Sequence, residues 1–268
     1  MIGQDYLVKK VNNINLDTLP RSLILLGDTG SGRHTLISLI ENKINIPSIE
    51  LTKNISKDVI DEIYLKVEPI IYVIDLDLIS IKEENMILKL VEEPLKNTYI
   101  IFISKNKSSI IPTILNRCQV WELKNYSDEE LRYFLTTKFD NYPEYFSLLE
   151  LCDTPGQLLN AIELGANISE MKALCEKIID CISIARFSNI LTIPNKLSFD
   201  NENDKFNYDL FVKLLHKCIK NRIIKNYDYK LLNAYKIVNK LLVDNKIAHV
   251  NKKQLFENAL YNLKFALG

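Results

Sequence analysis

Residues 23–35 read LILLGDTGSGRHT, a short apolar run that enters a glycine-rich turn, and an apolar helical stretch follows at residues 36–44. A buried strand, a glycine-rich turn and a helix in this order form a phosphate-binding loop, because successive backbone N–H groups and the helix N-terminus then face one point. We therefore predict a nucleotide pocket at Gly27, Gly30 and Gly32. The alternative is a glycine turn without a chemical role.

The residues after Gly32 depart from the pattern of a hydrolytic loop. That pattern has a lysine for the outer phosphates and then a serine or threonine for Mg²⁺, whereas this chain has Arg33 and His34. Arginine keeps the positive charge, but its planar guanidinium does not substitute for a compact ammonium. Neutral imidazole is a poor ligand for Mg²⁺, which prefers oxygen. Thr35 carries a hydroxyl one position too late.

Residues 70–77 read IIYVIDLD, an apolar strand that ends in an acid. In the Walker B arrangement the first carboxylate orients Mg²⁺ and the next residue, an acid, polarises the attacking water. Asp75 fills the first position, but Leu76 fills the second. Asp77 follows one residue later. Because side chains alternate along a strand, we expect Asp77 to point to the face opposite to that of position 76 and not to replace the missing acid. We predict a degenerate pocket with negligible ATP hydrolysis and with weak or no binding of ATP. ADP can still bind such a pocket, so ATP or ADP with Mg²⁺ is the candidate ligand.

Composition bounds the class of protein. The 268 residues suffice for one large domain or two to three small ones. No apolar run is long enough to cross a bilayer and the start of the chain lacks the features of a signal peptide, so we expect a cytoplasmic protein. The five cysteines have no paired metal-binding spacing, which predicts reduced, mostly packed thiols and no zinc or other metal site.

The formal net charge of zero hides an asymmetry. Residues 1–170 contain 17 Lys and Arg against 25 Asp and Glu, a net charge of −8, and residues 171–268 contain 17 against 9, a net charge of +8. A basic C-terminal third is compatible with contact to DNA. Solvated lysine faces on amphipathic helices and contacts with neighbouring subunits are the alternatives.

The apolar pattern changes character along the chain. Up to residue 123, short apolar strands alternate with helices, which predicts an α/β domain with a parallel five-stranded sheet, buried on both faces by helices. The strand candidates are residues 23–26, 48–51, 70–75, 99–104 and 120–123. Beyond residue 126 only helices are expected. A Ser127…Glu130 capping box opens one, and Thr154-Pro155-Gly156 opens another.

Four further helices are expected near residues 170–188, 207–225, 228–244 and 252–266, the last two starting at Asp228 and at an Asn251…Gln254 capping box. Residues 192–207, with the polar run 200–204, are expected to form a loop. The predicted domains are residues 1–123 (nucleotide-binding-like), 124–167 (an all-α lid) and 168–268 (an all-α collar that holds subunits together).

Three further segments carry a family resemblance. Residues 2–4 read IGQ, residues 85–94 read NMILKLVEEP and residues 110–118 read IIPTILNRC. In this order they resemble the AAA+ clamp-loader subunits of replicative DNA polymerases, which include bacterial gamma, tau and delta-prime and the replication factor C small subunits. The resemblance covers about residues 1–165. Residues 168–268 are similar only in being helical where the family has its oligomerising collar.

The resemblance implies roles for individual residues. Arg117 matches the arginine of the family's Ser-Arg-Cys motif, which acts in trans on a neighbouring subunit's nucleotide, although Asn116 replaces the serine. Ser104 and Asn106 are candidates for the sensor that follows the fourth strand. Residues 154–157 lack the second sensor arginine of active family ATPases, and residues 36–69 lack the cysteines of the zinc module. The missing sensor arginine favours a delta-prime-like member, and the missing zinc module favours a compact, phage-like or divergent form.

The resemblance thus implies a clamp-loader subunit of a DNA replication machine, such as DNA polymerase III. It would help to open a sliding clamp and load it onto primer-template DNA, in a hetero-oligomer with other clamp-loader subunits, and would donate an arginine finger to a neighbour. We expect its own site not to hydrolyse ATP. The alternatives are a gamma-like ATPase motor subunit with Arg33 in place of lysine, another AAA+ replication ATPase and a DNA-binding module.

Overall fold

The computed structural model describes residues 1–51, 55–149, 151–163, 168–182, 184–190, 192–197, 208–226, 229–245 and 251–268. The described chain divides into two compact units. The first consists of residues 1–140 and 153–157, and the second of residues 141–152 and 158–268. The three-domain division at residues 123/124 and 167/168 stays a prediction. The polar run at residues 200–204 and the helix start expected at Asp228 lie outside the described residues.

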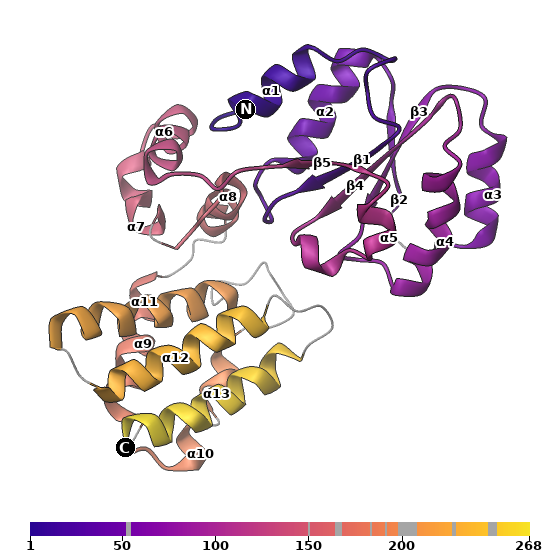
Figure 1. The fold of residues 1–268 in the computed structure, drawn as a ribbon. Helices are drawn as coiled ribbons and strands as arrows, with labels where there is room; N and C mark the ends of the chain where they lie inside the picture. Colours follow the sequence, from indigo (N-terminus) through magenta and orange to yellow (C-terminus); the bar gives the residue numbers. More distant parts are fainter. Residues whose placement is uncertain are drawn as a thin grey trace. The chain divides into compact units, whose positions relative to one another are not determined.

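The first unit is built on a parallel sheet of five strands in the order β2-β3-β4-β1-β5 (Figure 1). This confirms the predicted fold class. Parallel pairing brings the carboxyl ends of all strands to one edge of the sheet, where β1 leads into the glycine-rich turn and β3 ends at Asp75. The strands are β1 Ser22–Leu26, β2 Ser48–Leu51, β3 Ile70–Asp75, β4 Thr98–Ser104 and β5 Gln119–Glu122.

Burial differs between the centre and the edges of this sheet. The central strands β1, β3 and β4 are buried almost throughout. The edge strands β2 and β5 keep exposed residues, among them Glu50 and Glu122. The expectation that all five strands are buried on both faces is therefore wrong for these two, because an edge strand has a neighbour on one side only.

Helices cover both faces of the sheet (Figure 1). The apolar residues of α1 Asp5–Asn12 and α2 Arg33–Ile44 pack on one face. Those of α3 Lys57–Leu65, α4 Ile81–Glu92 and α5 Pro112–Leu115 pack on the other. A short helical turn, η1 Lys107–Ser109, precedes α5. The predicted Ser127–Glu130 capping box is present and opens α6 Asp128–Lys138.

The second unit is helical in its described residues. Its elements are η2 Tyr142–Tyr145, α7 Phe146–Leu149, most of α8 Pro155–Glu163, α9 Ile168–Cys181, α10 Phe187–Ile190, η3 Pro194–Lys196, α11 Tyr208–Asn226, α12 Tyr229–Asp244 and α13 Lys252–Leu267. Helix α11 packs against α9 and α12, and α12 packs against α13. The predicted cap of α13 is present, because the Asn251 side chain accepts the Gln254 N–H at 3.0 Å. Helix α9 ends at Cys181, earlier than expected.

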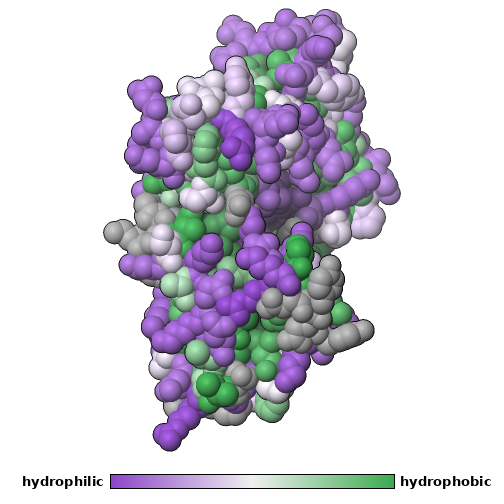
Figure 2. All heavy atoms as spheres, turned by 90° about the vertical axis from the view of Figure 1, so that its left-hand side faces the viewer, coloured by the Kyte–Doolittle hydropathy of each residue, from purple (hydrophilic) through white to green (hydrophobic). Residues whose placement is uncertain are grey.

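Hydrophobic side chains reach the surface in patches between hydrophilic ones on the face drawn in Figure 2. The most exposed large hydrophobic residues are Ile184, Val67, Leu65 and Tyr6. None of the described helices is both long and apolar enough to span a membrane. Of the five cysteines, Cys152, Cys175 and Cys218 are buried, Cys118 is half-buried and Cys181 is exposed.

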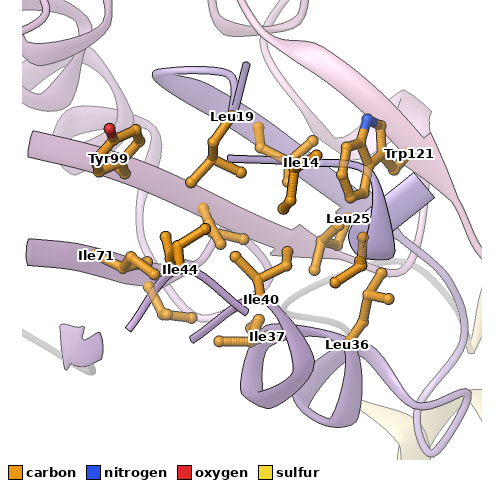
Figure 3. Packing of buried hydrophobic residues seen from close by; sticks show 14 of the residues in the cluster. Ile14, Leu19, Leu25, Leu36, Ile37, Ile40, Ile44, Ile71, Tyr99 and Trp121 are labelled. Atoms are coloured by element: carbon orange, nitrogen blue, oxygen red, sulfur yellow. The ribbon is translucent and has the colours of Figure 1, made fainter. Parts of the chain in front are cut away.

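The core under the glycine-rich turn holds β1 and α2 in place. Side chains of α2, among them Leu36 and Ile40, meet Leu25 of β1 and Trp121 of β5 (Figure 3). Both Leu25 and Leu36 are fully buried. Each such side chain contributes about 1.5–3 kcal/mol on burial. The core therefore fixes the strand and the helix that position the turn between them.

Candidate functional site

The glycine-rich turn joins the end of β1 to the start of α2 at residues 27–32. Gly30 and Gly32 have φ angles of 77° and 101°, a backbone conformation that favours glycine. Helix α2 starts at Arg33 without a side-chain cap. The first N–H groups of α2 are thus not used by a cap, and the helix N-terminus has the geometry of an anion site.

Arg33 is buried, with its guanidinium turned toward an acid of the same unit. Its Nη1 lies 3.8 Å from Asp77 Oδ2, and the exposed fractions of the two side chains are 6% and 16%. This Nη1 is buried without a hydrogen-bond partner, and so is the hydroxyl of Ser31. Two polar atoms of the glycine-rich turn and its helix start thus have unused hydrogen-bonding capacity.

Asp77 joins three elements. Its Oδ1 accepts the hydroxyl of Ser104 at 2.8 Å, and its Oδ2 accepts the backbone N–H of Lys105 at 2.9 Å. The expected alternation of side chains does not describe Asp77, and that Asp77 does not replace the missing acid stays a prediction. Strand β3 ends at Asp75, and residues 76–78 form a turn, so the alternation of a strand does not apply to Asp77.

Asp75 sits beside Asp77, and its Oδ1 accepts the Asp77 N–H at 2.9 Å. Burial raises the pKa of Asp75, and the charge of Asp77 adds to the rise, while the Asp77 N–H and the charge of Arg33 oppose it. Leu76 is buried and offers no group that polarises water. This carboxylate pair therefore binds the protein's own groups, and no acid stands at the Walker B glutamate position.

The residues expected at the Mg²⁺ position face elsewhere. His34 is 64% exposed, and its Nδ1 lies 3.4 Å from Glu50 Oε1 on the edge strand. Thr35 is exposed on α2. Of the two sensor candidates, Ser104 binds Asp77 through its hydroxyl, whereas Asn106 contributes its backbone carbonyl to Ser104 at 3.2 Å. The structure thus brings Arg33, Asp75, Asp77 and Ser104 together and leaves His34 outside this cluster.

ATP or ADP fits this pocket in part. The glycine backbone, the unpartnered Nη1 of Arg33 and the unpartnered hydroxyl of Ser31 suit a phosphate group. The residues do not suit Mg²⁺, because the nearest carboxylates already accept N–H and hydroxyl donors and because His34 faces Glu50. Among the described residues, no group of three or more His, Cys, Asp or Glu is arranged to hold a metal ion.

The carbonyl side of the glycine-rich turn is bound by distant residues that the sequence did not single out. The hydroxyl of Thr154 donates to Thr29 O at 2.8 Å, and the N–H of Gly156 donates to Gly30 O at 3.0 Å. The hydroxyl of Tyr126 donates to Ser31 O at 2.6 Å. Burial raises the pKa of Tyr126, which keeps this donor protonated.

The bonds from Thr154 and Gly156 bring the backbones of the turn and of the start of α8 into contact. A Cβ on Gly30 would lie 2.6 Å from Gly156 Cα. No local sequence pattern could have revealed the contact, because Gly30 and Gly156 are far apart in the chain. The Thr154-Pro155-Gly156 segment predicted a helix start and lacked a sensor arginine, but it did not indicate this contact.

Arg117 lies at the other end of the sheet. It precedes β5, which is parallel to β1 with Gln119 opposite Leu23, whereas the glycine-rich turn follows β1. Residues at a strand's start and after its end are about 15–20 Å apart at this strand length. Arg117 Nη2 lies 3.0 Å from Glu92 Oε1, and its Nη1 donates to Thr113 O at 3.1 Å. Burial raises the pKa of the neighbouring Cys118 thiol to about 12, so Cys118 stays protonated.

The chain is similar to subunits of DNA polymerase III. The family model for the DNA polymerase III delta subunit matches residues 29–127. The subunit gamma of Buchnera aphidicola (subspecies Acyrthosiphon pisum) is 25% identical over 241 residues, 74% of this chain and 64% of that protein. The subunit delta' of Haemophilus influenzae is 33% identical over 69 residues, 26% of this chain and 21% of that protein. The chain thus spans less than two thirds of the gamma subunit that it matches.

Solved structures share the fold. A DNA polymerase III gamma subunit-related protein from Thermotoga maritima matches with a TM-score of 0.52 at 14% identity. The match covers 97% of this chain and 99% of that protein's chain. A mutant of RuvB from Thermotoga maritima matches with a TM-score of 0.51 at 14% identity. This match covers 85% of this chain and 78% of the RuvB chain. At these identities the likeness concerns the fold alone.

Proposed function

We propose that this chain, which belongs to the AAA+ clamp-loader subunits of the DNA polymerase III gamma and delta-prime family, donates an arginine finger to a neighbouring subunit and does not hydrolyse ATP itself. Its partners are other clamp-loader subunits, a sliding clamp and primer-template DNA. In this delta-prime-like role, ATP on neighbouring subunits drives opening of the clamp, and the chain completes a neighbour's site. Residues 168–268 serve as the collar that holds the subunits together.

The state of its own pocket supports the proposal that the chain does not hydrolyse ATP itself. Arg33 has a counter-charge in Asp77, no acid stands beside Asp75 at the position that polarises water, and His34 is turned to Glu50. Hydrolysis needs a charged group on the outer phosphates, a bound Mg²⁺ and a positioned water. The chain keeps a charged group, Arg33, for the outer phosphates. It lacks side chains suited to binding Mg²⁺ and to positioning the water.

The position of Arg117 supports the proposed arginine-finger role. An arginine at the start of β5 cannot reach a phosphate bound at the end of β1, because the length of the strands separates them. It is nevertheless 42% exposed, so a phosphate of another subunit is accessible to it. A guanidinium that acts on a neighbour's nucleotide stabilises the negative charge of the transition state.

The test is ATP turnover of a complex reconstituted with its own partner subunits. Arg117→Ala should leave assembly intact and lower hydrolysis at the site it serves by about 10³-fold. Arg132→Ala, which removes an exposed arginine of α6, is the matched control and should keep full turnover. Full turnover of the Arg117→Ala complex would remove the finger role.

The alternative is a gamma-like motor subunit, and one observation favours it. The unpartnered Nη1 of Arg33 and hydroxyl of Ser31 suit a bound phosphate. Turnover of the purified chain well above background, abolished by Asp75→Ala, would support this alternative against the proposal. A role as another AAA+ replication ATPase or as a DNA-binding module has no further support from the described residues.

A further inference from the structure

The segment that carries Arg117 is attached to α4 at both of its ends. At one end, Glu84 Oε2 accepts the backbone N–H of Ile111, the residue before α5, at 3.3 Å. At the other end, Glu92 Oε1 lies 3.0 Å from Arg117 Nη2. The two glutamates are about 12 Å apart along α4 at 1.5 Å per residue. Helix α4 thus spans the whole segment.

The first attachment fixes the backbone. Glu84 is buried, with 3% of its surface exposed, and Ile111 caps α5 without a side-chain hydrogen bond of its own. Burial raises the pKa of Glu84, while the Ile111 N–H lowers it. Ile114 of α5 is fully buried in the cluster that also contains Ile87 and Leu90 of α4. The turn that leads to Arg117 is therefore packed in one position.

The second attachment fixes the side chain. The guanidinium of Arg117 binds Thr113 O through Nη1 and Glu92 through Nη2. A free arginine side chain has about 2 kcal/mol of rotamer entropy to lose, so one that is already held loses less when it binds. Glu92 is also the last residue of α4, where the helix dipole disfavours an anion, so its charge gives no support to its own helix.

We infer that Glu92 is a positioning residue that holds the Arg117 guanidinium against the end of α4 and the Thr113 carbonyl of α5, in the orientation in which it meets a neighbouring subunit's nucleotide. This inference rests on the proposed finger role. Glu92 acts through Arg117 alone and touches no substrate. Its effect is therefore expected in the turnover of the neighbouring site and not in the stability of this chain, because an ion pair that is 42% and 47% exposed contributes little to folding.

The experiment compares ATP turnover of the reconstituted loader with five versions of this chain: wild type, Glu92→Gln, Glu92→Lys, Arg117→Ala and the double variant Glu92→Gln with Arg117→Ala. Glu92→Gln should lower kcat of the served site about two- to fivefold, as expected for an exposed ion pair, and leave KM for ATP unchanged. Glu92→Lys, which replaces attraction by repulsion, should lower kcat further. In the Arg117→Ala background, Glu92→Gln should have no additional effect.

Glu93→Gln is the matched control, because Glu93 is the next residue, is equally acidic and is exposed. It should keep wild-type turnover, and all variants should keep the wild-type melting temperature. A loss with Arg117→Ala but none with Glu92→Gln would overturn this inference and leave the finger role standing. An equal loss from Glu92→Gln in both backgrounds would also overturn it. Full turnover with Arg117→Ala would overturn the proposed function and this inference together.

Discussion

Arg33 and Asp77 place opposite charges close together in the candidate pocket, and this pair is the main residue-scale difference from a hydrolytic loop. The carboxylate of Asp77 supplies a negative charge 3.8 Å from the guanidinium, where a hydrolytic loop has only the phosphates of its ligand near its lysine. Removing one member of a buried pair leaves an uncompensated charge. We therefore expect the pair to stabilise the pocket and to compete with any anionic ligand.

We expect Asp77→Asn to lower the melting temperature of the chain and to raise its affinity for polyphosphate. Loss of one partner of a buried pair lowers the free energy of unfolding by about 3–5 kcal/mol. The 3.8 Å separation without a hydrogen bond puts the expected loss near the lower end of this range.

Tripolyphosphate at about 100 times its Kd would raise the free energy of unfolding by about 2.7 kcal/mol. Thermal unfolding with and without tripolyphosphate measures both effects. Asp17→Asn, an exposed control, should behave as wild type, and equal ligand shifts in Asp77→Asn and wild type would contradict the competition.

Residue types predicted the character of this pocket better than residue positions did. That Arg33, His34 and Leu76 are poor substitutes followed from their chemistry alone. The position of Asp77 did not, because the alternation rule holds within a strand and β3 ends two residues earlier. The Glu92–Arg117 pair also lay beyond sequence reasoning, since it joins two segments that meet only through the packing of α5 on α4.

At the scale of elements, the glycine-rich turn is bound from both sides. Its strand and helix are fixed by the core, and its carbonyls at residues 29–31 are bound by Thr154, Gly156 and Tyr126. Hydrogen bonds from the start of α8 and from Tyr126 thus hold the turn on its carbonyl side. Since the contact of Gly30 with Gly156 brings two backbones together, it requires a residue without Cβ at both positions.

Gly156→Ala should therefore destabilise the chain. Alanine in place of a helical glycine ordinarily adds about 0.5–1 kcal/mol of stability, but here the added Cβ would overlap the backbone of Gly30. Overpacking of this kind costs about 1–3 kcal/mol. Denaturant unfolding of Gly156→Ala and of Asn160→Ala in the same helix measures the difference, and the control should be close to neutral. A Gly156→Ala chain as stable as the control would contradict this prediction. It would show that the backbones of the turn and of α8 move apart to accommodate the added Cβ.

Elements with strong local signals were predictable and those set by neighbours were not. All five strands, the Ser127 capping box and the Asn251 cap followed from hydrophobic runs and capping residues. The short elements η2 and α7 were missed, because a single helical turn has too few residues to show a period. The exposure of β2 and β5 depends on their place at the sheet edges, which no single segment encodes.

At the scale of the whole molecule, the charge asymmetry of −8 against +8 belongs to the two parts of the sequence on either side of residue 170. Some of the basic charge is already used within the second unit. Arg222 of α11 pairs with Glu176 and Asp180 of α9, and Lys252 of α13 pairs with Asp209 of α11 at 2.9 Å. Contact of the remaining lysines with DNA stays a prediction.

The collar proposal makes a prediction about the last helix. Helix α13 buries Phe256, Leu260 and Leu263. Tyr261 and Phe265 of the same helix are 51% and 62% exposed, with ring centroids 4.8 Å apart. Adjacent exposed aromatic rings are typical of surfaces that bind another protein, because they bury a large area at low entropic cost.

We expect the double variant Tyr261→Ser with Phe265→Ser to assemble at least about tenfold more weakly with partner subunits, a loss of about 1.4 kcal/mol. Folding should be unaffected because both side chains are largely exposed, which the melting temperature checks. Tyr133→Ser removes a tyrosine of α6 that is 60% exposed and serves as the matched control. Mass measurement of the complex over a dilution series gives the dissociation constants. If the double variant assembles as tightly as the control, this face of α13 is not part of the subunit interface. The collar would then have to use other exposed residues such as Ile184 or Val243.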